Sequence, residues 1–537
     1  MNFLTSEKNV LGRLLDEKAE KNGDKPYIYF EDQIISYRDL HERTNRVANG
    51  LVKMGVKKGD KVAIAMENCP ELIYTWFALS KIGAIEVPIN IAQKGKVLEY
   101  LLNYCDAQIL VITNSLIPQI KAIEDNLKEH IKTILVNGNY DEKQPFNRMS
   151  TELFQKLFDN PSNFPQIDVK HNDLMAIMFT SGTTGPSKGV MITHNQALFV
   201  GNQYVDLLGV GSSDLFYLYI PLFHMAAQFG MIVASLLCDS ALVLRREFSA
   251  ASFWKDINRY SCTISGMFEA VLKILMKDTE KDGDAYNTIK AFATAHIPPD
   301  IHEPFEKRFG VKLVNVYGLT EGDCICSATH NDIRVGSFGK PRGYFDVRVF
   351  DQIDQELPTG KVGEVVVRPS QSNIIFEGYY KMPGKTLETF KNLWWHTGDL
   401  AYKDEEGYFY FVGREKDMIR RGGENISALE VEMVVESHPD VKECAAMATP
   451  SDIWGEEVKI VVIKKEGKEI EYEDLIRFCD DRMAYFAVPR FIEFIESIPR
   501  TGASQRPIKS LLRGITVNTW DRVKAGVKIQ REIQKGK

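Results

Sequence analysis

A loop rich in glycine and hydroxyl groups, set between two apolar stretches, is the part of this sequence best suited to chemistry. The apolar stretch 174–179 leads into it and Val190 follows it. Three glycines permit tight turns that aim several backbone N–H groups at one anion. Lys188 adds a mobile positive charge, so the loop predicts a triphosphate site, although its spacing is not that of Walker A. A polar linker is the alternative, which the apolar flanks disfavour. The loop consists of Thr180, Ser181, Gly182, Thr183, Thr184, Gly185, Pro186, Ser187, Lys188 and Gly189.

A second segment brings an aromatic ring, a hydroxyl and a carboxylate together after a predicted strand at 311–316. Tyr317 is able to stack on a base, and Thr320 is able to bond a phosphate. Glu321 offers the oxygen ligands that Mg²⁺ prefers. Taken alone, this segment is equally well explained by a buried tyrosine and a surface glutamate.

Two later segments are polar at predicted turns. Asp399 offers a carboxylate that can accept hydrogen bonds from both hydroxyls of a ribose. In the segment 414–427, cations precede a Gly-Gly pair, and polar residues then stand where they would cap a helix starting near Leu429. A capped turn and a solvated charge run are the ordinary explanations of these two segments.

In their order and combination, the four segments resemble those of the adenylate-forming superfamily of acyl-CoA synthetases, peptide-synthetase adenylation domains and firefly-type luciferases. The resemblance extends over residues 37–513, and the loop 180–189 is its most specific motif. Within the superfamily the chain is most similar to the crotonobetaine/carnitine-CoA ligase group. That similarity lies in residues 67–72, 81–90 and 418–427.

The resemblance implies roles in nucleotide binding for the matching positions. The residues from Thr180 to Lys188 would close over the β- and γ-phosphates of ATP, with Thr320 on a phosphate and Glu321 holding Mg²⁺. Tyr317 would stack on adenine. Asp399 would bind the ribose hydroxyls, with Arg414 nearby.

The resemblance also implies a place for the acid and for coenzyme A. His224 would be the aromatic gate beside the substrate carboxylate. Lys416 would be the hinge about which a small domain swings between adenylation and thiol transfer. Gly422 and Gly423 would then line the pantetheine channel. The predicted substrate pocket comprises Phe223, Glu269, Ala293, Thr294, Ala295, His296 and Gly318.

The chain departs from the superfamily pattern near its C-terminus. Members usually carry a catalytic lysine in a Pro-Arg-Thr-x-x-Gly-Lys pattern, whereas this chain has Gln505-Arg506 at that place. Arginine keeps the charge and grips a carboxylate or phosphate with two hydrogen bonds, but its reach differs. We expect Arg506 to serve adenylation, and Lys509 is the competing candidate.

The acyl pocket departs from the pattern as well. A Gly-Gly pair common in the family aligns with Ala293 and Thr294, whose side chains would shorten or polarise the pocket. Glu269 stands where relatives often have proline, and beside Phe268 it could face a quaternary ammonium, helped by cation–π contact. A glutamate at a helix start is the alternative. We therefore expect a small polar acid, such as carnitine or crotonobetaine.

The expected fold is α/β. Helix-like and strand-like segments alternate in the first half, with strands at 61–66, 84–89, 109–113 and 133–136, which implies βαβ units. Residues 137–165 are polar and predict an irregular surface excursion. A small β-rich subdomain follows near 347–367. We expect a large N-terminal domain, residues 1–413, and a small mobile α+β C-terminal domain, residues 414–537, that rotates about Lys416.

Composition and net charge limit the classes of protein to which the chain can belong. A net charge of −7 over 537 residues disfavours nucleic-acid binding as the main task. Neither a secretory signal nor a run of about 20 apolar residues for a membrane-spanning helix is apparent. The eight cysteines lack CxxC spacing, and we expect Cys324 and Cys326 to be packing residues. These features favour a cytoplasmic protein. They leave the oligomeric state open, and a homodimer is compatible with them.

The predicted reaction converts a carboxylic acid, ATP and coenzyme A, with Mg²⁺, into acyl-CoA, AMP and pyrophosphate through an acyl-adenylate. The alternatives are a ligase for short- or medium-chain fatty acids, and an acyl-AMP ligase that loads a carrier protein. A luciferase-like oxygenase has no specific support. A non-catalytic sensor of ATP or acyl-adenylate is disfavoured by the presence of four residues: Lys188, Glu321, Asp399 and Lys416.

We predict that Arg506→Ala lowers the adenylation half-reaction by about 10²-fold, the usual effect of removing one group that stabilises transition-state charge. The two half-reactions are assayed separately, adenylation by ATP–pyrophosphate exchange and transfer by thioester formation from preformed acyl-adenylate. Normal adenylation with slow thiol transfer would show that the assignment is wrong.

Overall fold

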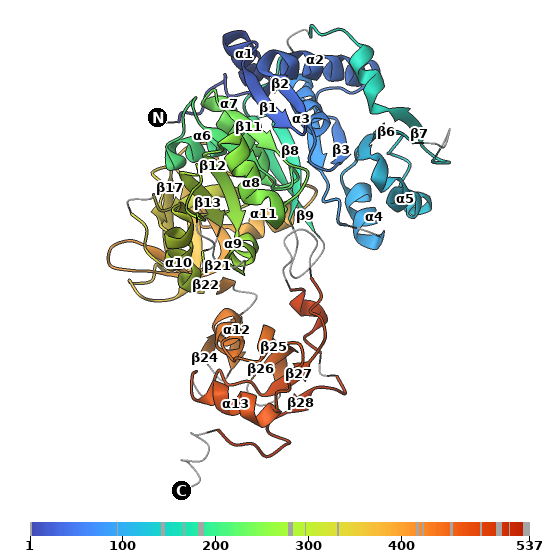
Figure 1. Cartoon of the computed structure of the whole chain (residues 1–537). Helices are drawn as coiled ribbons and strands as arrows, with labels where there is room; N and C mark the ends of the chain where they lie inside the picture. Colours follow the sequence, from blue (N-terminus) through green and yellow to red (C-terminus); the bar gives the residue numbers. More distant parts are fainter. Residues whose placement is uncertain are drawn as a thin grey trace. The chain divides into compact units, whose positions relative to one another are not determined.

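The protein is described from a computed structural model of the chain (Figure 1). Contacts between Cα atoms divide it into two compact units. The first comprises Met1–Thr180, Ser187–Val347 and Val367–Leu393, and the second includes Arg348–Val366 and Trp394–Lys537. The described residues are 3–93, 95–140, 145–164, 167–180, 187–277, 283–295, 297–329, 332–414, 418–421, 424–451, 455–483, 486–500, 507–514 and 516–529.

An eight-stranded sheet in the first unit has the order β19-β9-β8-β4-β3-β5-β6-β7. The strands from β8 to β7 along this order are mutually parallel, as the βαβ pattern predicts, whereas β9 is antiparallel to both β8 and β19. The strands are β3 (Lys61–Ala65), β4 (Ile85–Pro88), β5 (Ile109–Thr113), β6 (Thr133–Asn137), β7 (Ser150–Leu153), β8 (Leu174–Thr180), β9 (Lys188–Thr193) and β19 (Gly378–Tyr379).

A nine-stranded sheet in the same unit has the order β16-β15-β14-β13-β12-β10-β11-β1-β2. Its central strands β14, β13, β12, β10, β11 and β1 are parallel, and β15 returns antiparallel to β14. The strands are β1 (Pro26–Phe30), β2 (Gln33–Ser36), β10 (Leu215–Leu218), β11 (Ala241–Leu244), β12 (Ile264–Phe268), β13 (Ala291–Ala295), β14 (Lys312–Leu319), β15 (Gly322–Ser327) and β16 (Lys340–Pro341).

The helices of the first unit follow their sequence signals. α2 begins with a capping box between Ser36 and Asp39, and α3 begins with Pro70 and ends at Gly83, which has φ +75°. All residues of α3 except Glu71 are buried, so this helix is covered on every side. The helices are α1 (Leu11–Asn22), α2 (Tyr37–Lys53), α3 (Pro70–Ile82), α4 (Gly95–Tyr104), α5 (Ile117–Lys121), α6 (His194–Leu208), the π-helix η4 (Ala226–Val233), α7 (Ala234–Leu237), α8 (Ala250–Tyr260), α9 (Glu269–Lys277), α10 (Pro299–Phe309) and α11 (Pro383–Thr389).

The second unit contains two β-sheet regions. In one, β21 (Trp394–Lys403) lies beside β18 (Gly363–Pro369) and pairs antiparallel with β22 (Phe409–Arg414). The other has the order β24-β23-β26-β27-β28, with β25 on β26, and it packs on two helices through a core that includes Val435 and Ile460. Its elements are β23 (Met418–Arg421), β24 (Glu424–Ser427), α12 (Ala428–Glu436), β25 (Val441–Ser451), β26 (Gly455–Lys464), α13 (Tyr472–Asp480), β27 (Phe491–Phe494) and β28 (Trp520–Asp521). Two further strands, β17 (Phe345–Phe350) and β20 (Phe390–Lys391), belong to the sheet of β18 and β21.

These observations confirm the α/β fold class. The predicted excursion at 137–165 is wrong in part, because β7 pairs with β6 and Phe154 and Leu157 are buried. The contact division at Trp394 lies before the predicted boundary at Gly413, since β22 is paired to β21. Rotation about Lys416 stays a prediction, and that residue lies outside the described part of the chain. Within that part, none of the helices is both long and apolar enough to span a membrane.

Candidate functional site

The predicted acyl-pocket residues gather at one edge of the nine-stranded sheet. The strands β10, β12, β13 and β14 are neighbours and parallel, so their carboxyl ends meet at this edge. Ligands of open α/β sheets bind at such edges. Phe223 and His224 follow β10, Glu269 follows β12, Ala295 ends β13, and Gly318 lies near the end of β14.

Aromatic rings form the part of this edge that belongs to β10 and β12. The ring centroid of His224 lies 4.4 Å from that of Phe223 and 6.1 Å from that of Phe268. All three side chains are partly exposed. The backbone N–H of His224 donates to the carbonyl of Pro221 at 3.0 Å, which fixes the turn that carries the ring. This arrangement suits the predicted gate.

The remaining predicted pocket residues differ in accessibility. Ala293 and Thr294 are buried, and the Thr294 hydroxyl donates to the carbonyl of Phe292 at 3.4 Å. Ala295 and Gly318 are exposed. His296 lies outside the described residues. Glu269 begins α9 and forms an ion pair with Lys273, with 2.7 Å between Oε1 and Nζ, so its charge already has a cationic neighbour.

Glu321 is held from several directions. Its Oε1 accepts a hydrogen bond from the hydroxyl of Tyr379 at 2.7 Å. Its backbone carbonyl accepts from Gln196 Nε2 at 3.1 Å and from the N–H of Phe376 at 2.7 Å. The residue is 7% exposed, and no cation in the described part of the chain forms an ion pair with it. A carboxylate fixed in this way fits the oxygen chemistry of Mg²⁺.

Tyr379 also contacts the end of the predicted triphosphate loop. The Nζ of Lys188 lies 4.1 Å from the centroid of the Tyr379 ring. Lys188 begins β9, and β19 pairs with that strand through Tyr379 and Val190. Tyr379 thus contacts both Glu321 and Lys188, although none of the predicted motifs includes it. No local spacing marks it, because it meets Glu321 across 58 residues.

Other nucleotide-site predictions are placed in part. The Thr180 hydroxyl donates to the carbonyl of Lys188 at 3.5 Å across the antiparallel β8–β9 pair. Tyr317 stacks on Phe338 with ring centroids 4.3 Å apart, and Thr320 is partly exposed. Five predicted loop residues lie outside the described part of the chain: Ser181, Gly182, Thr183, Thr184 and Gly185.

Asp323 is a further charged residue at this edge. Its Oδ2 accepts from the Tyr204 hydroxyl at 3.2 Å, and its Oδ1 accepts from the N–H of Cys324 at 2.7 Å. A Cβ added to Gly318 would clash with Oδ1, so the carboxylate lies against that glycine. Burial raises the pKa of Asp323 to about 6, despite the opposing effect of the two hydrogen bonds. An aspartate leading into the apolar run Cys324-Ile325-Cys326 was the overlooked sequence signal.

The two cysteines on β15 confirm the packing prediction. Cys324 and Cys326 are fully buried. Cys324 also has φ +54°, an uncommon backbone angle for a residue other than glycine. Burial raises the pKa of the Cys324 thiol to about 12 and that of Cys326 well above its usual value. Among the residues that the structure describes, no group of three His, Cys, Asp or Glu is arranged to hold a metal.

In the second unit, Asp399 and Arg414 are cross-strand partners on β21 and β22. Asp399 is 2% exposed, and its N–H donates to the Thr397 hydroxyl at 3.1 Å. The preceding Gly398 has φ +73°, a conformation that favours glycine. Lys416, Gly422, Gly423 and Arg506 lie outside the described residues.

Lys509, the competitor of Arg506, has a partner within the second unit. Its Nζ lies 2.8 Å from Oε1 of Glu432, which also accepts from the N–H of Ala446 at 2.7 Å. The side chains of Lys509 and Glu432 are 14% and 15% exposed. Burial raises the pKa of Glu432, against the pull of Lys509. The ion pair gives Lys509 a structural task.

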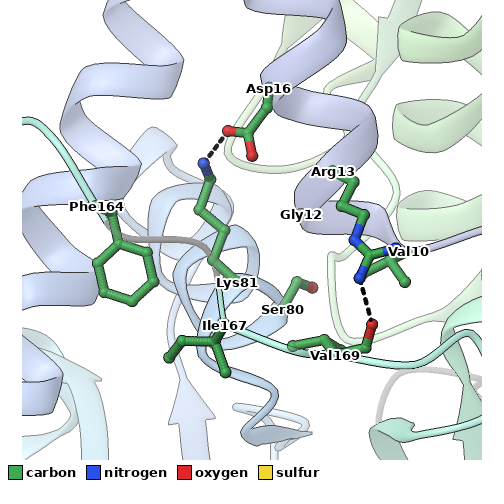
Figure 2. Close-up of a pocket in the computed structure, with 9 residues that line it drawn as sticks. All are labelled: Val10, Gly12, Arg13, Asp16, Ser80, Lys81, Phe164, Ile167 and Val169. Atoms are coloured by element: carbon green, nitrogen blue, oxygen red, sulfur yellow. Dashed lines mark hydrogen bonds and ion pairs between the residues drawn. The ribbon is translucent and has the colours of Figure 1, made fainter. Parts of the chain in front are cut away.

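A small cavity elsewhere in the first unit is unrelated to these residues (Figure 2). Asp16 on α1 and Lys81 on α3 point toward one another across it and form an ion pair. Arg13 donates to the carbonyl of Val169 at 3.0 Å. None of the predicted site residues lines it, and its polar contacts tie α1 to α3 and to the segment around Val169. The lining residues are Val10, Gly12, Arg13, Asp16, Ser80, Lys81, Phe164, Ile167 and Val169.

Comparison with known proteins gives one consistent family. Residues 15–380 match the AMP-binding enzyme family, and residues 430–504 match the AMP-binding enzyme C-terminal domain. A crotonobetaine/carnitine--CoA ligase of Citrobacter koseri is 32% identical over 516 residues, covering 94% of this chain and 98% of the relative. Its counterpart from Proteus mirabilis is 31% identical over 521 residues, covering 94% and 100%.

Solved structures with a similar fold agree with this family. ATP-bound MatB from Rhodopseudomonas palustris is 26% identical with a TM-score of 0.82, and the match covers 94% of this chain and 98% of that one. The anthranilate CoA ligase AuaEII in complex with anthranoyl-AMP is 25% identical with a TM-score of 0.82, covering 94% and 96%.

We predict that Tyr379→Phe raises the Mg²⁺ concentration needed for half-maximal ATP–pyrophosphate exchange by about tenfold. The reason is the lost hydrogen bond to the Glu321 carboxylate, since bonds to charged groups contribute about 1.5 kcal/mol or more. The ring, and with it the contact to Lys188, is kept. Tyr380→Phe is the matched control, because the Tyr380 hydroxyl donates instead to Asp106 Oδ2 at 2.8 Å. Equal Mg²⁺ dependence in both variants would contradict the prediction.

We predict that Lys509→Met lowers the thermal stability, with an effect of about 3 kcal/mol on the unfolding of the second unit, because the buried Glu432 loses its counter-charge. Adenylation by the folded variant should stay within about threefold of wild type. Scanning calorimetry and pyrophosphate exchange measure the two effects. A large loss of adenylation at unchanged melting temperature would instead give Lys509 the role expected of Arg506.

Proposed function

Because this chain belongs to the AMP-binding enzyme family, we propose that it activates a small polar carboxylic acid, such as crotonobetaine or carnitine, and joins it to coenzyme A. The chain is an acid–thiol ligase of the adenylate-forming type, related to the curated crotonobetaine/carnitine--CoA ligases. The acid, ATP and coenzyme A become acyl-CoA, AMP and pyrophosphate.

The observation that carries the proposal is the group formed by Glu321, Tyr379 and Lys188 beside the aromatic edge of the sheet. In the first step, a substrate carboxylate oxygen bonds to the α-phosphorus as the bond to pyrophosphate breaks. Both reactants are anionic, so positive charge must offset their repulsion. Bound Mg²⁺ would supply part of it at Glu321, and Lys188 would supply more at the phosphates.

The aromatic group at Phe223, His224 and Phe268 has a separate task in this proposal. The acyl-adenylate is a mixed anhydride, which water hydrolyses unless it is shielded. Rings beside the reacting carboxylate would exclude water until the thiol of coenzyme A attacks the acyl carbon and AMP leaves. Asp399 and Arg414 keep the role at the ribose that is expected from the sequence. Arg506, Lys416, Gly422 and Gly423 keep the roles expected from the sequence.

Two features support a small polar acid. The curated relatives found at 31–32% identity are crotonobetaine/carnitine--CoA ligases. Ala293 and Thr294 put side chains, one of them hydroxylic, where a straight apolar chain would need space. A short- or medium-chain fatty acid and a carrier-protein acceptor remain the competing assignments for the substrate and the thiol.

We predict that carnitine and crotonobetaine support ATP–pyrophosphate exchange with kcat/KM at least about tenfold above octanoate, a discrimination of roughly 1.4 kcal/mol. The kcat/KM for butyrate should lie between those for the two polar acids and that for octanoate. Added coenzyme A should convert the adenylate to thioester. Lys188→Ala is the inactive control. Octanoate as the best substrate, or thioester formed only on a carrier protein, would refute the corresponding assignment.

A further inference from the structure

The carboxylate of Asp323 lies behind the open backbone of Gly318. Gly318 is exposed and lies near the carboxyl end of β14, where the predicted acyl pocket is. Since a Cβ on Gly318 would clash with Asp323 Oδ1, only glycine at this position lets the carboxylate approach the pocket edge. Asp323 itself is 8% exposed. A negative group therefore lies directly behind the pocket wall.

The packing around Asp323 fixes this position. Tyr204 on α6 donates to Oδ2, and its ring packs against Gly230, where an added Cβ would come within 2.8 Å of the ring carbons. Gly230 belongs to the π-helix η4, which begins two residues after His224. Thus α6, β14 and β15 meet at this carboxylate, and η4 packs against the Tyr204 ring that contacts it. Helices of the π type occur often at functional sites.

Within the described part of the chain, no cation balances the charge of this carboxylate. Asp323 accepts hydrogen bonds from Tyr204 and Cys324, and no Lys, Arg or His in the described ranges forms an ion pair with it. Glu269 differs, since Lys273 lies 2.7 Å from its Oε1 and its side chain is 37% exposed. A buried ion without a counter-ion costs free energy. That cost is offset when a bound ligand supplies the opposite charge.

We propose that Asp323 is a substrate-recognition residue that binds a positively charged group, of the quaternary ammonium class, on the acid that is activated. This inference rests on the proposed function and deepens it. The acid's own carboxylate would lie toward Glu321, two residues before Asp323 in the chain, while its cationic end would face the Gly318 wall. The rings of Phe223 and Phe268 at the same edge are suited to the remaining faces of such a cation.

A neutral acid of the same shape gains no binding free energy from the Asp323 carboxylate. It would displace water from the region of Asp323 without replacing the lost solvation, so the pocket would reject it. Sites with buried polar groups discriminate strongly against ligands that leave those groups without a partner. Asp323 would therefore determine specificity, and the chemical step itself would not require it.

The test compares two acids of matched shape, crotonobetaine and its uncharged carbon isostere 5,5-dimethylhex-2-enoate, in ATP–pyrophosphate exchange with the full-length chain. Wild type should prefer crotonobetaine by about 30-fold or more in kcat/KM, the effect of about 2 kcal/mol at a buried charge pair. Asp323→Asn should raise KM for crotonobetaine by a similar factor, leave kcat nearly unchanged, and leave the isostere within about threefold.

Two matched variants separate charge from packing. Glu306→Gln removes a carboxylate outside the predicted pocket that already has a cationic partner, Lys312, and it should alter the preference by less than about threefold. Tyr204→Phe removes a hydrogen bond but keeps the Asp323 carboxylate, so it should retain the preference for the cationic acid. A selective loss in Asp323→Asn alone supports the inference. Equal losses for both acids, or an unchanged preference, overturn it.

The wild-type measurement keeps the inference falsifiable if Asp323→Asn does not fold. Equal activation of the two acids by wild type overturns the role of Asp323 while leaving the proposed ligase reaction intact. Exchange with octanoate but with neither matched acid refutes the acid named in the proposed function, and the inference falls with it. Absence of exchange with every acid refutes the ligase activity itself.

Discussion

The hydrogen bond from the Tyr379 hydroxyl to the Glu321 carboxylate is the contact on which the site in the first unit depends. Glu321 follows β14 of the nine-stranded sheet, and Tyr379 lies on β19 of the eight-stranded sheet. One 2.7 Å bond thus joins Glu321 to β19, which pairs with β9, the strand that begins at Lys188. The junction of the two sheets thus brings the Glu321 carboxylate, the Tyr379 ring and the Lys188 cation together.

Much of this arrangement follows from the sequence because it is encoded locally. The alternation of helix-like and strand-like segments predicts the parallel strands. The capping box at Ser36 and the proline at the start of α3 mark helix starts. The spacing of the loop before Lys188 and of Tyr317 to Glu321 is the local signal that predicts the nucleotide site. Strand β7 escaped prediction because its residues are polar, and it pairs on only one side, with β6, at the sheet edge.

Tyr379 and Asp323 escaped prediction for a different reason. The importance of each lies in a contact that sequence spacing does not reveal: Tyr379 meets Glu321 across 58 residues, and Tyr204 meets Asp323 across 119. A carboxylate against Gly318 is visible only once β15 is folded back on β14. The proposed specificity residue is therefore visible only in the tertiary structure, whereas the motifs predict the general reaction.

The thiols of β15 carry a consequence for an enzyme that makes a reactive acyl donor. An acyl-adenylate acylates any thiolate nearby, and coenzyme A is meant to be the only acceptor. Cys324 follows Asp323 directly, yet its thiol is fully buried with a pKa of about 12, and Cys326 is buried with its pKa raised as well. Both stay protonated and are poor nucleophiles. Burial thus protects these two thiols from acylation while the acyl-adenylate awaits the thiol of coenzyme A.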